Sequence, residues 1–370
     1  MWLFGAHVIN LLMTRCEHIK EIISVDLLPF HWVKGLEPPA NPESSIRLRH
    51  IICDLRKYSD VNKACQKNID VVIHTAGFID VGTGQDWNQL VDVNVKAVDN
   101  VIRACIANNI PYLVHTSSQD VAAGMDPLHN IGDDSVSIPT KFFYKYAETK
   151  FEGEQLVIHA NNSLLLNEKR LLTVALRPCS IYGEGDNNIV TPALRVAYKM
   201  GGVLVRFGDQ KVVFQYAYAG NIAWAHILAM QHLQHSDTLE QNKGTKTVES
   251  QPIAGKCFFI MDETPARNLF DNIKPYVEDR GIRISDVVVP FWIMYCVALF
   301  LEFITFILKP FTSLNYPLTR QVLYSMYVHH NFNYNGARKH LKYKPIFTPE
   351  EAMQRSLVYY RSIEINPHVT

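Results

Sequence analysis

The chain has 370 residues, 48% of them hydrophobic, and 36 basic side chains balance 36 acidic ones. This length can bury a large core, and the composition excludes a disordered protein. The neutral balance gives no sign of a nucleic-acid partner. The seven cysteines are scattered, without a pair at C-x-x-C spacing. We therefore expect reduced thiols facing the cytosol and no metal site.

The first predicted element lies in "MWLFGAHVINLLMTR", where Val8, Leu11 and Leu12 fall at helical spacing. No basic residue precedes the apolar stretch, so a signal peptide is not expected. Next, "IISVDLLPF" predicts a short buried strand that ends in Asp26. A helix followed by a strand ending in an acid is half of a dinucleotide-binding unit. Such a unit normally begins with a strand and a glycine-rich turn.

Short apolar runs and helical stretches then alternate. The predicted strands cover 22–25, 49–53, 71–75, 112–117 and 173–176, and the predicted helices cover 61–67, 87–108 and 144–160. This alternation predicts an α/β fold with a doubly wound parallel sheet, covered by helices on both faces. The polar stretch 235–251 is predicted to be an exposed loop.

Residues 291–308 are apolar except for Thr305 and Glu302, and Pro290 precedes them. The segment is close to the roughly 20 residues that a membrane span requires. It could be a buried helix over an apolar pocket, a helix lying in the membrane interface, or a span. Because a charge at mid-span costs roughly 2–3 kcal/mol, we expect membrane association more than a full span.

The most informative stretch is "FFYKYAETKFEGEQ", where Tyr146 and Lys150 share one helix face. An ammonium beside a phenol favours the phenolate and lowers a pKa that starts near about 10. The phenol can then exchange a proton with a hydroxyl or ketone. Upstream, "PYLVHTSS" predicts a strand whose carboxyl end would place Ser118 in the ligand crevice. A surface Tyr–Lys pair and an ordinary turn are the structural alternatives.

These residues carry a resemblance to the extended short-chain dehydrogenase/reductase family. The blocks are "VVIHTAG", "NVKAVDNVIRAC", "YLVHTSS", "YAETK", "LRPCSIYGEGD" and "FGDQKVVFQYAYAGNIAWAHILA". Within that family the chain looks most like the 3β-hydroxysteroid dehydrogenase branch, which includes sterol 4α-carboxylate 3-dehydrogenases. The later stretches "GKCFFIMDETP", "PFWIMYCVALFLEFITFILKPF" and "GARKHLKYKPIFTPEEAM" resemble the tail of that branch.

The resemblance implies an NAD-binding Rossmann-like core in residues 1–180 and a substrate-binding region in 181–370 that contains the apolar segment 291–308. Tyr146 would be the catalytic acid/base, and Lys150 would lower its pKa and hold the cofactor ribose. Ser118 would polarise the substrate oxygen, and Asn94 would support the lysine through water.

The same resemblance implies that NAD is the cofactor. Asp26 would bind the adenosine ribose hydroxyls, and its charge would repel the 2′-phosphate of NADP. The other residues expected at the cofactor are Gly5, Asp54, Thr75, Ala76, Gly77, Lys150, Pro178 and Cys179. For those outside the Tyr–Lys–Ser set, ordinary packing or turn chemistry is the alternative.

The implied reaction is oxidation of the 3β-hydroxyl of a steroid or sterol to a 3-ketone, and a Δ5–Δ4 isomerisation stays open. The implied location is an endoplasmic reticulum membrane or the cytoplasmic face of an internal membrane. A homodimer through the helices near 87–108 and 144–160 also stays open. One alternative is a sterol-binding or membrane-associated homologue without turnover. Another is a reductase of other apolar or phenolic carbonyls that uses NADP, which Asp26 argues against.

One family block is incomplete. The family begins with a strand and then T-G-G-x-G-F-x-G, whereas "LFGAHVINLL" matches only its end, with Gly5 as the last glycine. The first strand would be central, so its neighbours are expected to lack ladder partners. An incomplete gene model or a splice form of a normal enzyme is favoured over a homologue that binds sterol or a partner without turnover, because the downstream Tyr–Lys–Ser set is intact.

Overall fold

The structure is a computed structural model that describes residues 3–37, 46–66, 68–241 and 253–365. Its main sheet is parallel, with the strand order β10-β6-β4-β3. The strands are β3 (Val71–His74), β4 (Tyr112–Thr116), β6 (Leu172–Pro178) and β10 (Lys256–Ile260). A second parallel pair consists of β1 (Glu21–Asp26) and β2 (Arg47–Ile52).

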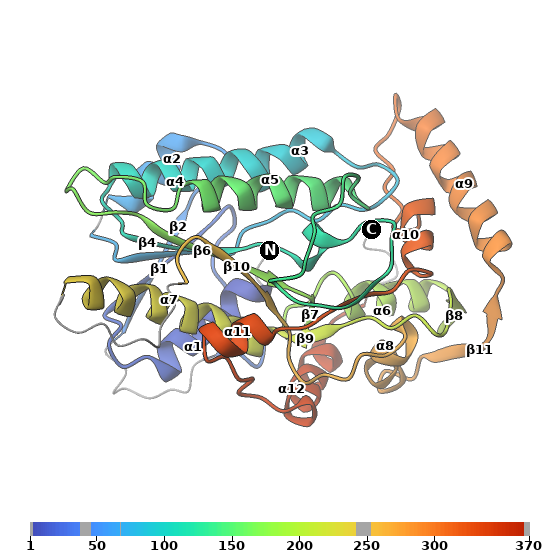
Figure 1. Ribbon diagram of the computed structural model, residues 1–370. Helices are drawn as coiled ribbons and strands as arrows, with labels where there is room; N and C mark the ends of the chain where they lie inside the picture. The colour runs from blue at the N-terminus through green and yellow to red at the C-terminus, as the bar shows by residue number, and fades with distance from the viewer. Residues whose placement is uncertain (1–2, 38–45, 67, 242–252, 366–370) are drawn as a thin grey trace.

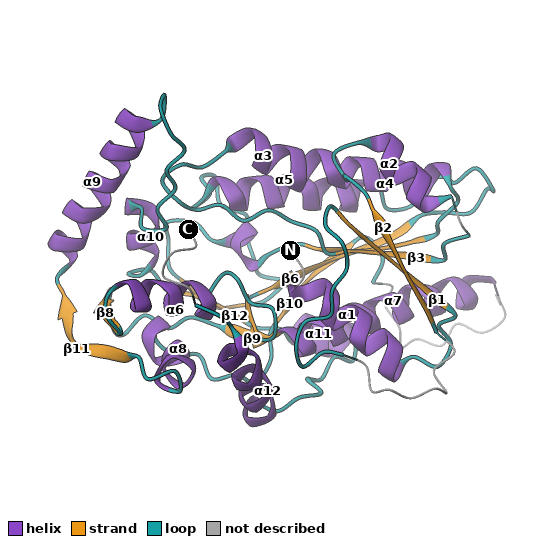
Figure 2. Ribbon diagram, turned by 180° about the vertical axis from the view of Figure 1, so that it is seen from behind, coloured by secondary structure: helices purple, strands orange, loops and turns teal. Residues whose placement is uncertain are grey.

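Helices cover both faces of the strands (Figures 1 and 2). On one face lie α1 (Leu3–Arg15) and α7 (Ala219–Gln241), which pack on Val114 and Val174. On the other face lie α2 (Tyr58–Cys65), α4 (Ala97–Ala107) and α5 (Lys145–His159), which share a cluster with Leu113. Successive strand residues point to opposite faces, so this arrangement confirms the predicted doubly wound sheet.

Strands β1 and β3 lie at the edges of their two sheets. In the described ranges, β1 is hydrogen-bonded only to β2, and β3 only to β4. Residues 71–73 of β3 are correspondingly only half-buried, whereas all of β4 is buried.

Each of the five predicted strands is confirmed, with bounds that shift by at most two residues. The predicted helix 87–108 is confirmed as one uninterrupted helical run, but its middle turn is not α-helical. It consists of α3 (Trp87–Val91), a π-helical turn (Asp92–Lys96) and α4. The predicted loop 235–251 is wrong over its first residues, because α7 continues to Gln241. Residues 242–251 of that loop, and residue 67 of a predicted helix, lie outside the described residues.

The later part of the chain adds short paired strands and helices beside the main sheet. The strands are β5 (Leu128–Ile131) with β12 (His330–Phe332), β7 (Ser180–Tyr182) with β9 (Tyr216–Tyr218), and β8 (Val203–Phe207) with β11 (Arg283–Val289). The helices are α6 (Val190–Lys199), α8 (Leu269–Glu278), α9 (Phe291–Leu308), α10 (Arg320–Ser325), α11 (Asn335–His340) and α12 (Pro349–Ser362).

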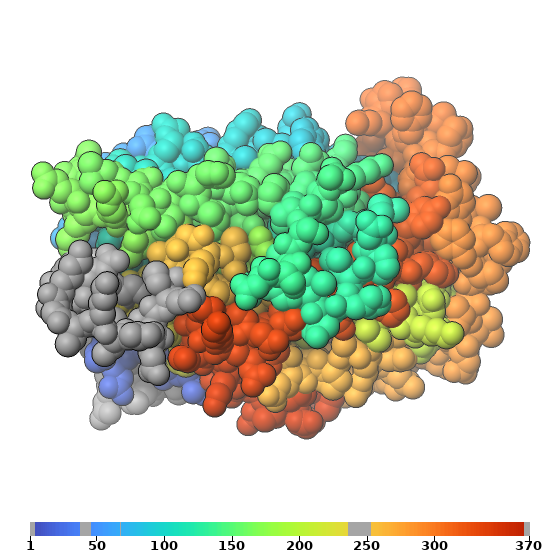
Figure 3. Space-filling model, in the orientation of Figure 1, coloured from blue at the N-terminus to red at the C-terminus, as the bar shows by residue number. Residues whose placement is uncertain are grey.

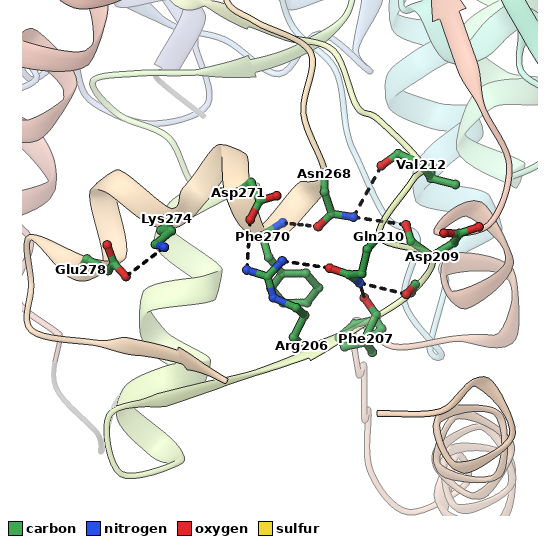
Figure 4. A network of polar contacts seen from close by, with 11 residues as sticks. Arg206, Phe207, Asp209, Gln210, Val212, Asn268, Phe270, Asp271, Lys274 and Glu278 are labelled. Atoms are coloured by element: carbon green, nitrogen blue, oxygen red, sulfur yellow. Dashed lines mark hydrogen bonds and ion pairs between the residues drawn. The ribbon is translucent and has the colours of Figure 1, made fainter. Parts of the chain in front are cut away.

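A polar network fastens β8 to α8 (Figure 4). The guanidinium of Arg206 donates to Asp271 at 3.0 Å and to Gln210 at 2.9 Å. Asn268 caps α8 by accepting from the amide of Phe270, and its side-chain amide donates back to the carbonyl of Asp209. Strand β8 pairs with β11, which leads into α9, so these bonds hold in place the strand pair that precedes α9.

A buried ion pair joins α5 to β6. Arg177 donates from Nη2 to Glu154 Oε1 at 2.6 Å and from Nε to Glu154 Oε2 at 2.8 Å. Ser117, just past β4, donates to the same Oε2 at 2.7 Å. Both charged side chains are buried, so each depends on the other for its counter-charge.

Glu154→Gln should lower the free energy of unfolding by about 3–5 kcal/mol, because Arg177 would keep a buried charge without a partner. Urea denaturation measures this change. The control is Glu278→Gln, which removes the exposed pair with Lys274 at 3.7 Å and should cost less than about 1 kcal/mol (Figure 4). Equal losses in the two variants would contradict the assignment of Glu154 as a core residue.

Candidate active site

Ser118 and Tyr146 meet where β4 ends. The strand is buried to Thr116, and the chain then passes through two serines into a short 3₁₀ helix (Gln119–Ala122). Tyr146 lies in the first turn of α5. Ser118 lies close enough to the phenol of Tyr146 to lower its pKa, and both residues are buried. The structure therefore brings together the predicted acid/base and the predicted polarising hydroxyl.

Lys150 lies one helical turn beyond Tyr146, beneath the same strand end. Its ammonium donates to the carbonyl of Thr116 at 2.7 Å. Burial lowers the pKa of Lys150 to about 8, and the negative charge of Glu154 opposes this shift. Burial and the hydrogen bond to Thr116 hold the ammonium of Lys150 in one position, which suits a side chain that contacts a bound molecule.

The predicted lowering of the Tyr146 pKa by Lys150 stays a prediction, and the shift in this structure has other causes. Burial raises the pKa of Tyr146 above its ordinary value, and the negative charge of Asp120 adds to the rise. The hydrogen bond from Ser118 acts in the opposite direction. Spacing on a helix showed that Tyr146 and Lys150 share a face, but it could not show that desolvation would dominate.

Asn94 lies in the π-helical turn and binds the loop that follows β3. Its Oδ1 accepts from the amide of Phe78 at 2.8 Å, and its Nδ2 donates to the carbonyl of Phe78 at 2.9 Å. Nδ2 also lies 3.1 Å from the hydroxyl of Thr149 on α5. Close packing at Gly153 allows this arrangement, because a Cβ there would overlap the backbone oxygen of Asn94.

The residues predicted at the middle of the cofactor follow the carboxyl ends of the parallel strands. Thr75, Ala76 and Gly77 come directly after β3, while Pro178 ends β6 and Cys179 follows it, buried. A Cβ added at Gly77 would lie 3.6 Å from Asn94 Oδ1 and 3.7 Å from Lys150 Nζ. Parallel strands present their carboxyl ends along one edge, where α/β proteins bind ligands.

Gly5 and the two predicted aspartates also lie near strand ends. A Cβ at Gly5 would be 3.6 Å from Thr75 Oγ1, which places the start of α1 beside the end of β3. Asp26 ends β1, and its carboxylate accepts from the amide of Leu28 at 3.0 Å. Asp54 forms a bidentate pair with Arg56, and this pair lowers the pKa of Asp54.

Asp120 is a residue of this site that the sequence analysis missed. Its amide donates to Ser118 Oγ at 3.2 Å. Burial raises the pKa of Asp120 to about 6. The available signal was an acid two residues after Ser118 in "TSSQD".

Metal and disulfide chemistry were not expected. All seven cysteines are free. Within the ranges that the structure describes, no group of three or more His, Cys, Asp or Glu side chains could hold a metal ion.

The model of the 3-beta hydroxysteroid dehydrogenase/isomerase family matches residues 3–291. The chain is 28% identical to the 3 beta-hydroxysteroid dehydrogenase type 7 of Mus musculus, over 97% of this chain and 93% of the relative. It is 27% identical to the Homo sapiens enzyme of the same name, with the same coverage.

Solved structures of low identity share the fold. An epimerase from Methanothermobacter thermautotrophicus superposes with a TM-score of 0.68 at 14% identity, covering 97% of this chain and 89% of that one. The UDP-glucuronic acid 4-epimerase of Bacillus cereus, solved with UDP-glucuronic acid and NAD, superposes with a TM-score of 0.64 at 17% identity, covering 97% and 96%.

Gly153→Ala should separate α5 from the π-helical turn, because the new methyl group would overlap the backbone of Asn94. We expect a loss of about 1–3 kcal/mol of stability from overpacking, measured by urea denaturation. Gly5→Ala is the matched control, since its methyl group would make only an ordinary contact with Thr75. Equal stability of Gly153→Ala and Gly5→Ala would contradict the close packing of α5 on the π-helical turn.

Proposed function

The chain belongs to the 3-beta hydroxysteroid dehydrogenase/isomerase family, and from this premise we propose that it oxidises the 3β-hydroxyl of a steroid or sterol to a 3-ketone with NAD. The observation that carries the proposal is that Ser118 and Tyr146 lie buried together where β4 ends, with Lys150 buried one helical turn away. A phenol and a hydroxyl that converge at one point can share a single substrate oxygen.

In this proposal Ser118 and Tyr146 bind the 3-oxygen of the substrate. Tyr146 takes the hydroxyl proton during oxidation and returns it during reduction. Burial and Asp120 favour the protonated phenol. We propose that the ammonium of Lys150, one helical turn away, favours the phenolate needed for oxidation. Asn94 holds the loop at Phe78, and this fixes Gly77 beside Lys150.

NAD fits the residues along the carboxyl edge of the strands. Asp26 at the end of β1 offers a carboxylate to the adenosine ribose, and its charge disfavours the 2′-phosphate of NADP. Gly77 leaves room for close approach beside Lys150, which would hold the nicotinamide ribose. Asp54, Thr75, Ala76, Pro178 and Cys179 are proposed to line the remainder, with Gly5 where α1 begins. Bound NAD supplies the hydride acceptor.

Helix α9 supports membrane association. It is the one helix of the described chain that is long and apolar enough to cross a membrane, with a mean hydropathy of 2.2 and only 11% of the segment buried. It forms the orange lobe at the edge of the molecule (Figures 1 and 3). Among its exposed side chains are Trp292, Phe300, Phe303 and Phe306. An exposed apolar surface of this kind is typical of a membrane-contacting surface.

The opposite face of α9 contacts other segments of the protein. Glu302 accepts from Arg320 Nε at 2.7 Å, and the hydroxyls of Thr305 and Thr83 lie 2.8 Å apart. Ala298 on the same face is fully buried. These contacts favour a helix that lies in the membrane interface over one that leaves the protein to span the bilayer.

The contacts of α9 also connect it to the active site. Thr83 belongs to the loop that begins at Phe78, which Asn94 holds. A sterol dissolved in lipid would thus enter beside the site. An endoplasmic reticulum membrane and a homodimer through α4 and α5 remain predictions from the resemblance.

Tyr146→Phe should reduce NAD-dependent oxidation of a 3β-hydroxysterol by about 10²–10⁴-fold, because the phenyl ring cannot accept the proton. The increase in NADH absorbance measures the rate. Tyr198→Phe, on the exposed side of α6, should retain normal activity. Normal turnover by Tyr146→Phe would show that the acid/base assignment is wrong.

Replacing Phe300, Phe303 and Phe306 together with serine should reduce binding to phosphatidylcholine vesicles by at least about tenfold, because each ring contributes roughly 1.5–3 kcal/mol when buried in lipid. Co-sedimentation measures the bound fraction. The control is the double variant Leu164→Ser, Leu166→Ser, which removes two exposed leucines outside α9 and should leave vesicle binding unchanged. Unchanged binding by the phenylalanine variant would exclude α9 as the membrane surface.

A further inference from the structure

A cavity of about 400 Å³ lies beside β10, at the opposite edge of the main sheet from β3. Its walls come from β10, from α11 and from the loop that follows β5. In Figure 3 the gold atoms of the β10 segment lie between the red atoms of α11 and the sea-green atoms of that loop. The residues proposed to bind NAD and the substrate are not among those that line it. Its volume lies within the range of about 300–1,000 Å³ that is typical of small-molecule sites.

Arg177 forms part of the cavity wall and keeps unused donors there. Its Nη2 and Nε bind Glu154 at 2.6 and 2.8 Å, whereas its Nη1 donates to no residue that the structure describes. The side chain is only 6% exposed, so it is fixed in the wall. A guanidinium has five N–H donors and no acceptor, and its donors bind phosphate and carboxylate oxygens well. The wall of the cavity therefore offers a site for an anion.

More cationic side chains surround the same cavity, namely Lys256 on β10 and Lys339 on α11. Neither ammonium forms an ion pair or a hydrogen bond with a described residue. Their charges reach His340, which also lines the cavity: burial lowers the pKa of His340, and Lys256 and Lys339 lower it further. The exposed carboxylate of Asp134 opposes this shift. Unpaired cations around a hollow attract an anionic ligand.

Asp133 supplies an acceptor in the same cavity. Its Oδ1 accepts from the backbone amide of Phe259 at 2.6 Å. Its Oδ2 is buried and has no hydrogen-bond partner among the described residues. A Cβ at Gly336 would overlap Oδ2, so the start of α11 packs directly on the carboxylate. A buried acceptor without a donor is unfavourable, and a ligand hydroxyl that donates to Oδ2 would satisfy it.

We propose that this cavity binds a phosphorylated polyol, such as a sugar phosphate. Arg177, Lys256 and Lys339 hold the phosphate, and Asp133 accepts a hydrogen bond from a hydroxyl of the polyol. A phosphate alone would leave Oδ2 of Asp133 without a donor, whereas a phosphorylated polyol satisfies both the cations and the acceptor. The site is separate from the residues proposed for NAD and the sterol, so it does not depend on the proposed function.

This chemistry has two sources, a free sugar phosphate and the headgroup of a phosphoinositide in a membrane. In Figures 1 and 3, α11 lies at the front of the molecule, well apart from the orange α9 that carries the proposed membrane surface. The same phosphate contacts would serve either source. The test therefore uses one probe of each kind.

The first test is calorimetric titration of the purified chain in mild detergent with glucose 6-phosphate. We expect it to bind at least about tenfold more tightly than glucose or inorganic phosphate, because only the sugar phosphate contacts both the cations and Asp133. The double variant Lys256→Gln, Lys339→Gln should weaken this binding at least about tenfold. The control is Lys199→Gln with Lys211→Gln, which removes two exposed lysines outside the cavity and should bind normally.

Asp133→Asn tests the acceptor separately. The amide oxygen can still accept from Phe259, but an N–H donor then replaces one carboxylate oxygen. Inorganic phosphate should bind no more weakly than before, because a negative charge is lost. The preference for glucose 6-phosphate over inorganic phosphate should largely disappear. An unchanged preference would contradict the role of Asp133.

The second test is co-sedimentation with phosphatidylcholine vesicles that contain phosphatidylinositol 4-phosphate. Extra binding over pure phosphatidylcholine that requires Lys256 and Lys339 supports the proposal and assigns the membrane source, whereas calorimetric binding alone assigns the free sugar phosphate. Binding of neither probe by the folded wild type would overturn the proposal. Binding that survives loss of both lysines, or glucose 6-phosphate that NAD displaces, would also overturn it, since the ligand would then lie elsewhere.

Discussion

The buried pair of Glu154 and Arg177 fixes α5 against the sheet, and the candidate active site depends on that placement. Tyr146 and Lys150 lie on α5, whereas Ser118 follows β4, so their meeting depends on how helix and strand are joined. Ser117 adds to the join by donating to Glu154 at 2.7 Å. Gly153 then permits α5 to touch the π-helical turn that carries Asn94.

A second constraint is the separation between β1 and β3. Each is bonded on one side only within the described chain, although both carry residues proposed to hold NAD. Asp26 depends on the β1–β2 pair, and Gly77 depends on β3. Contact between Gly5 and Thr75 connects α1 to the end of β3. The β1–β2 pair and the four-stranded sheet, which carry the two parts of the proposed cofactor site, are thus held together by side-chain packing and by α1. Among the described residues, no backbone hydrogen-bond ladder joins these two sheets.

Periodicity was sufficient to predict the five strands and the doubly wound sheet, because buried strands are short apolar runs between helices. The family blocks then placed Tyr146, Lys150 and Ser118, and the structure brings them together at the end of β4. Sequence could not show the π-helical turn, in which the side chain of Asn94 is hydrogen-bonded to the backbone of Phe78. It also missed Asp120, and it could not show that burial raises the pKa of Tyr146, because desolvation is a property of the packed structure.

The central claim is that the carboxyl edge of these strands holds NAD beside Lys150 and Tyr146. Calorimetric titration of the purified chain with NAD in mild detergent tests it most directly. The account predicts binding in the micromolar range, with at least about tenfold weaker binding for Asp26→Ala, since loss of the ribose contacts costs roughly 1.4 kcal/mol or more. A folded chain that binds no NAD, or an Asp26→Ala variant that binds it equally well, would contradict the account.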